Sequence, residues 1–162
     1  MIKAMNSERI DRAELKIAAS TDVIYRAFLE PSLLEKWLPP MGMSGKVHEI
    51  DASQGGGYVM SLYHRDVTPA VPGKTTERED RFWVLFDELT PGRQIVQRVV
   101  FDAADLSFAG AMKQTWTFQS SGQLTTVSVA CENVPSGIRP EDHAIGLNSS
   151  LQNLARAVET EL

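Results

Sequence analysis

The side chains that could bind a metal ion or attack a substrate are few and widely spaced. The three histidines are His48, His64 and His143, and Cys131 is the single cysteine. No pair of histidines has the His-x-His or helical i, i+4 spacing that places two ligands on one metal, and the cysteine has no second thiol. We therefore predict no metal site, no bound cofactor and no intrachain disulfide.

Motifs for phosphate binding and covalent catalysis are also missing from the sequence. Gly73-Lys74-Thr75 resembles the end of a phosphate-binding loop, but Thr68 stands where that loop requires a glycine. The run Gly55-Gly56-Gly57 lacks the Gly-x-Gly-x-x-Gly spacing and precedes an expected strand, so it indicates a turn. No Gly-x-Ser-x-Gly nucleophile elbow occurs. We therefore assign no catalytic residue from a motif.

Proton transfer is a further chemistry that the sequence leaves open. Glu88 has the same strand parity as Val84 and Phe86, so its carboxylate could point inward at the edge of a sheet. Apolar surroundings raise the pKa of a carboxyl group and allow it to move a proton near neutral pH. Arg98 and His143 are the other candidates, and a solvated Glu88 is the alternative.

The hydrophobic pattern predicts the elements that must position these groups: a strand, two helices, about six further strands and a closing helix. Ser20 is a suitable N-cap for the first helix, and Pro31 can begin a second helix that ends at Trp37. Residues 64–80 are expected to form a long exposed connection whose charged end could extend the next strand. Two-residue periodicity and β-propensity place strands over residues 12–18, 46–51, 58–63, 81–89, 93–101, 112–119 and 123–131.

The longest predicted helix closes the chain. Pro140 suits the first helical position, where the helix dipole also favours the charges of Glu141 and Asp142. One apolar stripe follows, made of Ala144, Leu147, Leu151, Leu154, Ala155, Val158 and Leu162. An antiparallel sheet with one long helix across a face is an α+β fold, here β-α-α-β(6)-α. If the sheet is strongly curved, a single helix leaves a space beneath it.

Length and charge restrict the partners. The 162 residues suit one domain over 1–162 with a core at about 11–160. A net charge of −5 argues against a general nucleic-acid binder, because such proteins cluster positive charge. The longest apolar run, 82–86, is far shorter than the ~20 residues of a membrane helix, and early charges leave no signal peptide. We expect a cytoplasmic protein without a membrane partner, and a homodimer is left open.

Several segments together resemble one known family. Residues 18–28 are similar to its opening strand-to-helix signature, and residues 34–40 to its tryptophan-containing second helix. Residues 49–58 resemble its acidic turn and double glycine, while residues 86–91 and 116–118 fit its central strands. The family is the activator of heat-shock-protein-90 ATPase homologue-like family of the START/birch-pollen-allergen (SRPBCC) superfamily. The resemblance implies a START-like helix-grip fold, with a ligand cavity between the curved sheet and the last helix.

Strand parity then nominates the residues that face this cavity. They are Tyr58, Met60, Leu62, Val84, Phe86, Val99, Met112, Gln114, Trp116 and Phe118 from the strands, and Leu147 and Leu151 from the helix. Gln114 and Tyr58 are the polar groups best suited to orient a ligand, and Trp37 is a candidate for the cavity mouth. The alternative is that all of these residues fill a dry core.

Three functions follow from these expectations. The first is non-covalent binding of an apolar or lipid-like small molecule, since aromatic and methionine side chains with a few polar groups suit such a ligand. The second is an enzyme resembling polyketide cyclases or dehydratases, with an acid/base pair in the cavity. The third is an interaction module for a chaperone partner, which the resemblance alone suggests.

Overall fold

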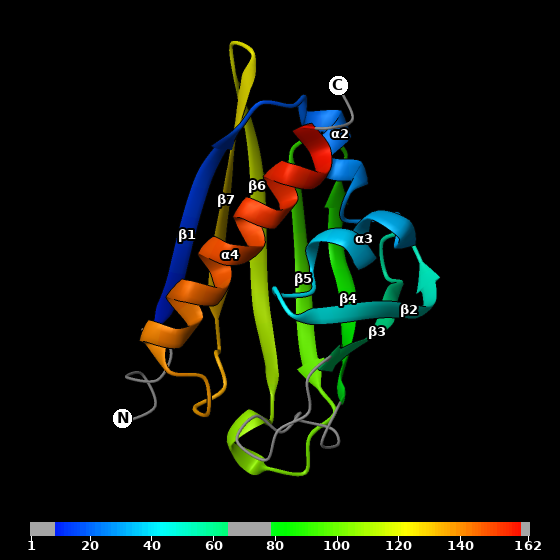
Figure 1. Cartoon of the computed structure of the whole chain (residues 1–162), viewed down its shortest axis with the longest axis vertical. Coiled ribbons are helices and arrows are strands. Elements are labelled where there is room, and N and C mark those ends of the chain that lie inside the picture. The colour runs from blue at the N-terminus through cyan, green and yellow to red at the C-terminus, as the bar shows by residue number, and fades with distance from the viewer. Residues whose placement is uncertain (1–8, 65–78, 160–162) are drawn as a thin grey trace.

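A computed structural model describes residues 9–64 and 79–159 of the chain (Figure 1). Its strands form one seven-stranded sheet in the order β1-β7-β6-β5-β4-β3-β2, and every neighbouring pair is antiparallel. The strands are β1 (Ile10–Ile17), β2 (Met43–Asp51), β3 (Gly57–His64), β4 (Glu79–Thr90), β5 (Gln94–Phe101), β6 (Ala111–Ser121) and β7 (Leu124–Glu132). The predicted α+β fold is confirmed.

The helices begin where the sequence predicts them. In α2 (Thr21–Arg26), the Ser20 hydroxyl accepts a hydrogen bond from the Val23 backbone N–H at 3.2 Å. Pro31 occupies the first turn of α3 (Pro31–Trp37), where a missing N–H costs nothing. A short 3-10 helix, η1 (Leu106–Phe108), precedes β6, and α4 (Pro140–Glu159) closes the described chain.

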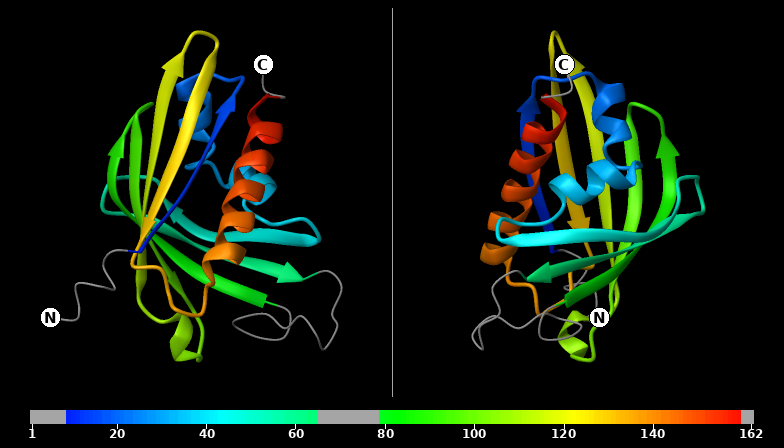
Figure 2. Two further views of the ribbon diagram at one scale, coloured as in Figure 1. Left: turned by 90° about the vertical axis from the view of Figure 1, so that its left-hand side faces the viewer. Right: turned by 45° about the vertical axis from the view of Figure 1, so that its right-hand side comes forward.

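The sheet is strongly curved, and α4 runs diagonally across its concave side (Figures 1 and 2). This helix packs mainly along β1 and against α3, while α2 packs against β6. We call the concave side the inner face; its central residues include Val84, Ile95, Trp116 and Val127, all of which are buried. The arrangement is the helix-grip form that the family resemblance implies.

The predicted connection over residues 64–80 falls mostly on residues 65–78, which lie outside the described residues. Its charged end belongs to β4, as the sequence allowed, because that strand already begins at Glu79. Farther along β4, the pairing with β5 shifts between Phe86 and Glu88. This bulge breaks the two-residue alternation, so Glu88 is exposed and the inward orientation that parity suggested for it is wrong.

Gly57 shows how closely the strands approach at the start of β3. A Cβ atom at this position would lie 2.0 Å from the backbone oxygen of Val84 on β4. No side chain fits in that distance, so the last glycine of the 55–57 run, which begins β3, is required by packing. The preceding turn accounts for Gly55, whose φ of 92° is a conformation that glycine adopts without a steric cost.

Candidate functional site

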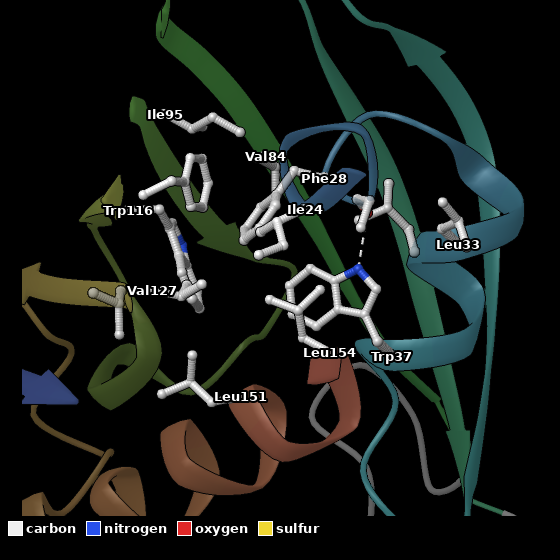
Figure 3. Packing of buried hydrophobic residues seen from close by; sticks show 14 of the residues in the cluster. Ile24, Phe28, Leu33, Trp37, Val84, Ile95, Trp116, Val127, Leu151 and Leu154 are labelled. Atoms are coloured by element: carbon white, nitrogen blue, oxygen red, sulfur yellow. Dashed lines mark hydrogen bonds between the residues drawn. The ribbon is translucent and has the colours of Figure 1, made fainter. Parts of the chain in front are cut away.

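Aromatic rings from the α2–α3 region and from β6 pack against one another on the inner face, and Figure 3 shows Phe28, Trp37 and Trp116 among them. We call Phe28, Trp37, Trp116 and Phe118 the aromatic cluster. The Phe28 ring centroid lies 4.9 Å from Trp37, 4.9 Å from Trp116 and 5.4 Å from Phe118. These distances and tilted orientations are favourable for aromatic pairs. Two segments far apart in sequence, the α2–α3 region and β6, are held together by these rings.

Trp37 belongs to this core and does not lie at a solvent-open mouth. It is 1% exposed, and its indole N–H donates to the Ala27 carbonyl oxygen at 2.8 Å (Figure 3). The role suggested for it at a cavity mouth stays a prediction, and what the structure shows is a packing role. The physical reason is that α3 presses this side chain between Phe28 and the inner face, where its one polar atom already has a backbone partner.

The nominated cavity residues come together in space. One buried cluster contains Tyr58, Met60, Val84, Phe86, Val99, Met112, Trp116, Phe118, Leu147 and Leu151, and Leu62 packs against it from a half-buried position. Gln114 is half-buried on the same face of β6 as Trp116. Two strands separate Gln114 on β6 from Tyr58 on β3, so the two polar groups are not neighbours. That these residues line a ligand cavity stays a prediction.

A row of polar side chains crosses the inner face next to the aromatic cluster. The strand register places Asp11 of β1 opposite Cys131 of β7, Cys131 opposite Gln114 of β6, and Gln114 opposite Gln97 of β5. We call these four residues the polar row. Antiparallel partners share a face, so all four side chains project to the same side of the sheet.

Hydrogen bonds join the Gln97 end of the polar row to the aromatic cluster. Gln97 Nε2 donates to Gln114 Oε1 at 2.9 Å, and Trp116 Nε1 donates to the same oxygen at 3.2 Å. Gln97 is only 5% exposed, and its Oε1 has no hydrogen-bond partner among the described residues. A buried carbonyl oxygen without a partner costs about 1–3 kcal/mol. A buried polar atom of this kind calls for a physical explanation.

The Asp11 end of the row forms an ion-pair network with α4. The Asp11 carboxylate accepts from Arg9 Nη2 at 2.9 Å and lies 2.7 Å from His143 Nδ1. Burial opposes ionisation of Asp11, but the hydrogen bonds and charges of Arg9 and His143 outweigh it and hold the pKa of this carboxyl below its ordinary value. The network fixes the first turns of α4 on β1, and it orients the His143 ring.

Burial keeps two further polar groups of the inner face neutral. It raises the pKa of the Cys131 thiol to about 12, and the neighbouring Asp11 charge adds to this effect. A thiol in this state is a poor nucleophile, because the thiolate is the reactive form. Burial also raises the pKa of Tyr58, whose ring packs against Phe82 and Phe86. Neither group is suited to act as an acid or base near neutral pH.

A serine, a histidine and a carboxylate meet at β2, β3 and β4, although no motif predicts them. The fully buried Ser61 donates to Glu79 Oε2 at 2.5 Å, and its Oγ lies 2.9 Å from His48 Nε2. Since the only hydroxyl proton points to Glu79, His48 must donate to Ser61 and cannot act as its base. The Ser61 hydrogen bond also lowers the pKa of Glu79, as does the charge of Arg81. The arrangement therefore stabilises an ionised Glu79 and does not activate a nucleophile.

The opposite side of the sheet presents apolar groups of a different kind. Trp83 and Leu85 of β4 are 37% and 38% exposed, and both line a hollow of about 230 Å³ together with Val59 of β3. Sequence parity places these residues on the face of the sheet opposite to the inward-facing Val84.

Within the described ranges, no three His, Cys, Asp or Glu side chains converge as a metal site would require.

Sequence reasoning missed Gln97 and Asp11, although parity could have found both. Gln97 lies two residues before Val99, which strand parity nominated for the inner face, and so it shares that face. Asp11 has the same parity as Ala13 on β1. A polar residue at an inward position of an apolar strand is the signal that identifies each of them.

Comparison with known proteins agrees with this architecture. Residues 18–159 match the family described as Activator of Hsp90 ATPase homolog 1-like protein. The crystal structure of protein CV1439 from Chromobacterium violaceum is similar, with 34% identity and a TM-score of 0.81 over 93% of this chain and 96% of that one. Protein NE0264 from Nitrosomonas europaea shares the fold at 16% identity, with a TM-score of 0.70 over 94% and 95% of the two chains.

A more distant fold relative is DynU16, a protein in the dynemicin biosynthetic locus. It aligns with 94% of this chain and 48% of its own length, at 20% identity and a TM-score of 0.63. No protein with a curated description matches the chain. In the described part of the chain, no helix has the length and apolar character needed to cross a membrane. The match over residues 18–159 and the 34% identical structure show that the chain belongs to the Activator of Hsp90 ATPase homolog 1-like family.

Proposed function

We propose that this protein binds a small, mostly apolar molecule on the inner face, between the sheet and α4. The observation that carries the proposal is the buried Gln97 Oε1, which has no hydrogen-bond partner among the described residues. Folded proteins satisfy nearly all buried polar atoms, so an exception next to buried apolar neighbours supports a partner supplied by a bound molecule. Val99, Phe86 and Met112 around this position supply an apolar lining.

The test is a pair of filling variants on β5 that differ by one residue. Val99 faces inward and Val100 lies next to it on the opposite face of the strand. Val99→Trp should fold with little loss of stability, because its ring occupies the ligand space, and it should abolish binding of the probe 2-methoxynaphthalene. Val100→Trp, the matched control, should bind the probe like the wild type. Binding would be measured by isothermal titration calorimetry and stability by urea denaturation.

The same experiment also tests the alternative of a dry core. If the interior is solid, Val99→Trp overpacks it and loses about 1–3 kcal/mol of unfolding free energy. Wild-type protein would then bind no probe, and the proposal would be wrong. Equal probe binding by the wild type and a folded Val99→Trp variant would place the ligand elsewhere.

The Asp11–His143 pair favours a second candidate, an enzyme that moves a proton in the same space. Asp11 holds His143 Nδ1 at 2.7 Å, and an aspartate that fixes one ring nitrogen leaves the other available for proton transfer. A cyclase or dehydratase of this kind would release water from its substrate. His143→Gln protein should then carry a co-purified molecule heavier by one water than the one in the wild type. If native mass spectrometry finds a co-purified molecule of the same mass in His143→Gln and in the wild type, this reaction is excluded.

An interaction with a chaperone partner and a cytoplasmic location stay predictions. The exposed Trp83 and Leu85 on the outer side of β4 are the apolar groups that such a partner would contact. A Trp83→Ser variant would reduce partner capture without affecting probe binding on the inner face. Loss of probe binding in this variant would contradict the separation of the two faces.

A further inference from the structure

We propose that the ligand carries a neutral hydrogen-bond donor, a hydroxyl or an N–H group, and that Gln97 Oε1 accepts it. This inference rests on the proposed binding function and names the class of ligand that the inner face selects. The ligand is thus an apolar body with one buried donor, such as an alcohol, a phenol or an amide N–H. Gln97 is the residue that determines this specificity.

The direction of the hydrogen bonds follows from Trp116. An indole N–H can only donate, so the Gln114 atom 3.2 Å away must be its acceptor oxygen. Gln97 approaches the same oxygen at 2.9 Å and must therefore present its own NH₂ group. The Gln97 carbonyl oxygen is left over, and the amide cannot be turned around without placing two oxygens against each other. The Trp116 indole N–H thus fixes the orientation of both side-chain amides.

The surroundings of Gln97 favour a neutral donor over a charged one. Its neighbours on the inner face are Ile95 and Val99 along β5 and Phe86 across on β4, all of them buried and apolar. Burying an ammonium group among such side chains costs far more than one hydrogen bond returns. A carboxylate or carbonyl would instead direct its lone pairs at those of Gln97 Oε1. The charged member of the row, Asp11, is separated from Gln97 by β7 and β6.

The experiment compares matched naphthalene probes on the full chain. 2-Naphthol offers a hydroxyl donor, whereas 2-methoxynaphthalene has the same rings with the donor removed. Wild-type protein should bind 2-naphthol about tenfold more tightly in calorimetry, as expected for one buried hydrogen bond. Gln97→Met should bind the two probes equally, because it loses affinity for 2-naphthol and keeps its affinity for 2-methoxynaphthalene. Gln94→Met on the same strand but the opposite face is the control and should keep the tenfold preference.

A second variant tests whether Trp116 sets the orientation of the Gln114 and Gln97 side-chain amides. Trp116→Phe removes the indole N–H, so both amides can turn and Gln97 can present its NH₂ group to the ligand. This variant should lose the preference for 2-naphthol and gain affinity for 2-acetylnaphthalene, which offers a carbonyl acceptor. An unchanged preference for 2-naphthol in this variant would show that Trp116 does not set the orientation of the two amides.

The outcomes separate this inference from the proposed function. If wild-type protein binds both 2-naphthol and 2-methoxynaphthalene with equal affinity, the inner face binds apolar molecules but does not select a donor, and only the inference is wrong. If neither probe binds, the proposed function and the inference fail together. The wild-type comparison decides between these results even if a variant does not fold.

Discussion

The aromatic cluster and the polar row lie side by side on the inner face, yet they satisfy their polar atoms very differently. In the cluster, the Trp37 indole N–H reaches the Ala27 carbonyl, and Phe28 is surrounded by other rings. In the row, Asp11 and Gln114 have partners, whereas Gln97 Oε1 has none among the described residues. Under the proposed function, the cluster contributes mainly stability and the row mainly recognition.

Trp116 belongs to both regions and links the two roles. Its ring packs against Phe28 at 4.9 Å, and its N–H donates to Gln114. A rigid aromatic core therefore orients the amides of the polar row, in the way that supporting contacts preorganise a binding site. Substitutions in the two regions should accordingly differ in what they change, and the following predictions test that difference.

The largest effect is expected in the aromatic cluster. Phe28→Ala removes the ring that contacts Trp37, Trp116 and Phe118, and a phenylalanine truncated to alanine in a core costs about 3–5 kcal/mol of unfolding free energy. Urea denaturation followed by tryptophan fluorescence would measure this loss. A loss below about 1 kcal/mol would contradict the assignment of the cluster as the principal stabilising core.

A smaller and pH-dependent effect is expected at the Asp11 end of the row. Asp11→Asn weakens the hydrogen bonds to Arg9 and His143 and should cost about 1–2 kcal/mol at neutral pH. The pKa of Asp11 is lower in the folded protein, so its contribution is complete above its ordinary pKa of about 4. That contribution is lost as the pH falls through the lowered value.

Thermal melts of the wild type and Asp11→Asn between neutral and acidic pH would test this pH dependence. The difference between the two proteins should shrink as the solution becomes acidic. Glu14→Gln on the exposed face of β1 is the matched control and should track the wild type at every pH. A difference that stays constant down to acidic pH would show that the Asp11 charge does not stabilise the fold.

The smallest effect on stability is expected at the other end of the row. Gln97→Met replaces a buried amide with an apolar chain of similar length, and it removes an oxygen that has no partner among the described residues. Unfolding free energy should therefore change by less than about 1 kcal/mol, or increase. A loss as large as that of Phe28→Ala would show that Gln97 is a structural residue and would remove the distinction between the two regions.

Much of the fold could be predicted from the sequence, because its signals are local. Ser20 and Pro31 mark the helix starts, and alternation marks the strands on both sides of the turn at residues 122–123. Inward residues such as Trp116 and Val84 follow from the same alternation. Strand parity predicted the wrong orientation for Glu88, because a β-bulge shifts the register between β4 and β5 just before this residue. The bulge arises from the pairing of the two strands, and no residue in the sequence marks it clearly.

The polar interactions could be predicted far less well, because each joins residues that are distant in the chain. His143 meets Asp11 across 132 positions, and Ser61 meets Glu79 only through the pairing of β3 and β4. Gln114 was identified from its strand parity, whereas its partner Gln97 required the register between β5 and β6. The candidate site thus emerges from sheet pairing, while its apolar surroundings are visible in the sequence.

The most direct test of ligand binding on the inner face uses the tryptophan indole signals as reporters. Trp116 lies on the inner face and Trp83 on the outer face of the same sheet, and the single variants Trp83→Phe and Trp116→Phe would assign these two of the three tryptophan indole resonances. Titration of ¹⁵N-labelled protein with 2-naphthol should shift the Trp116 indole N–H and the side-chain amides of Gln97 and Gln114, while Trp83 stays in place. A shift of Trp83 alone, or saturable binding that leaves Trp116 and both glutamines unmoved, would contradict the account.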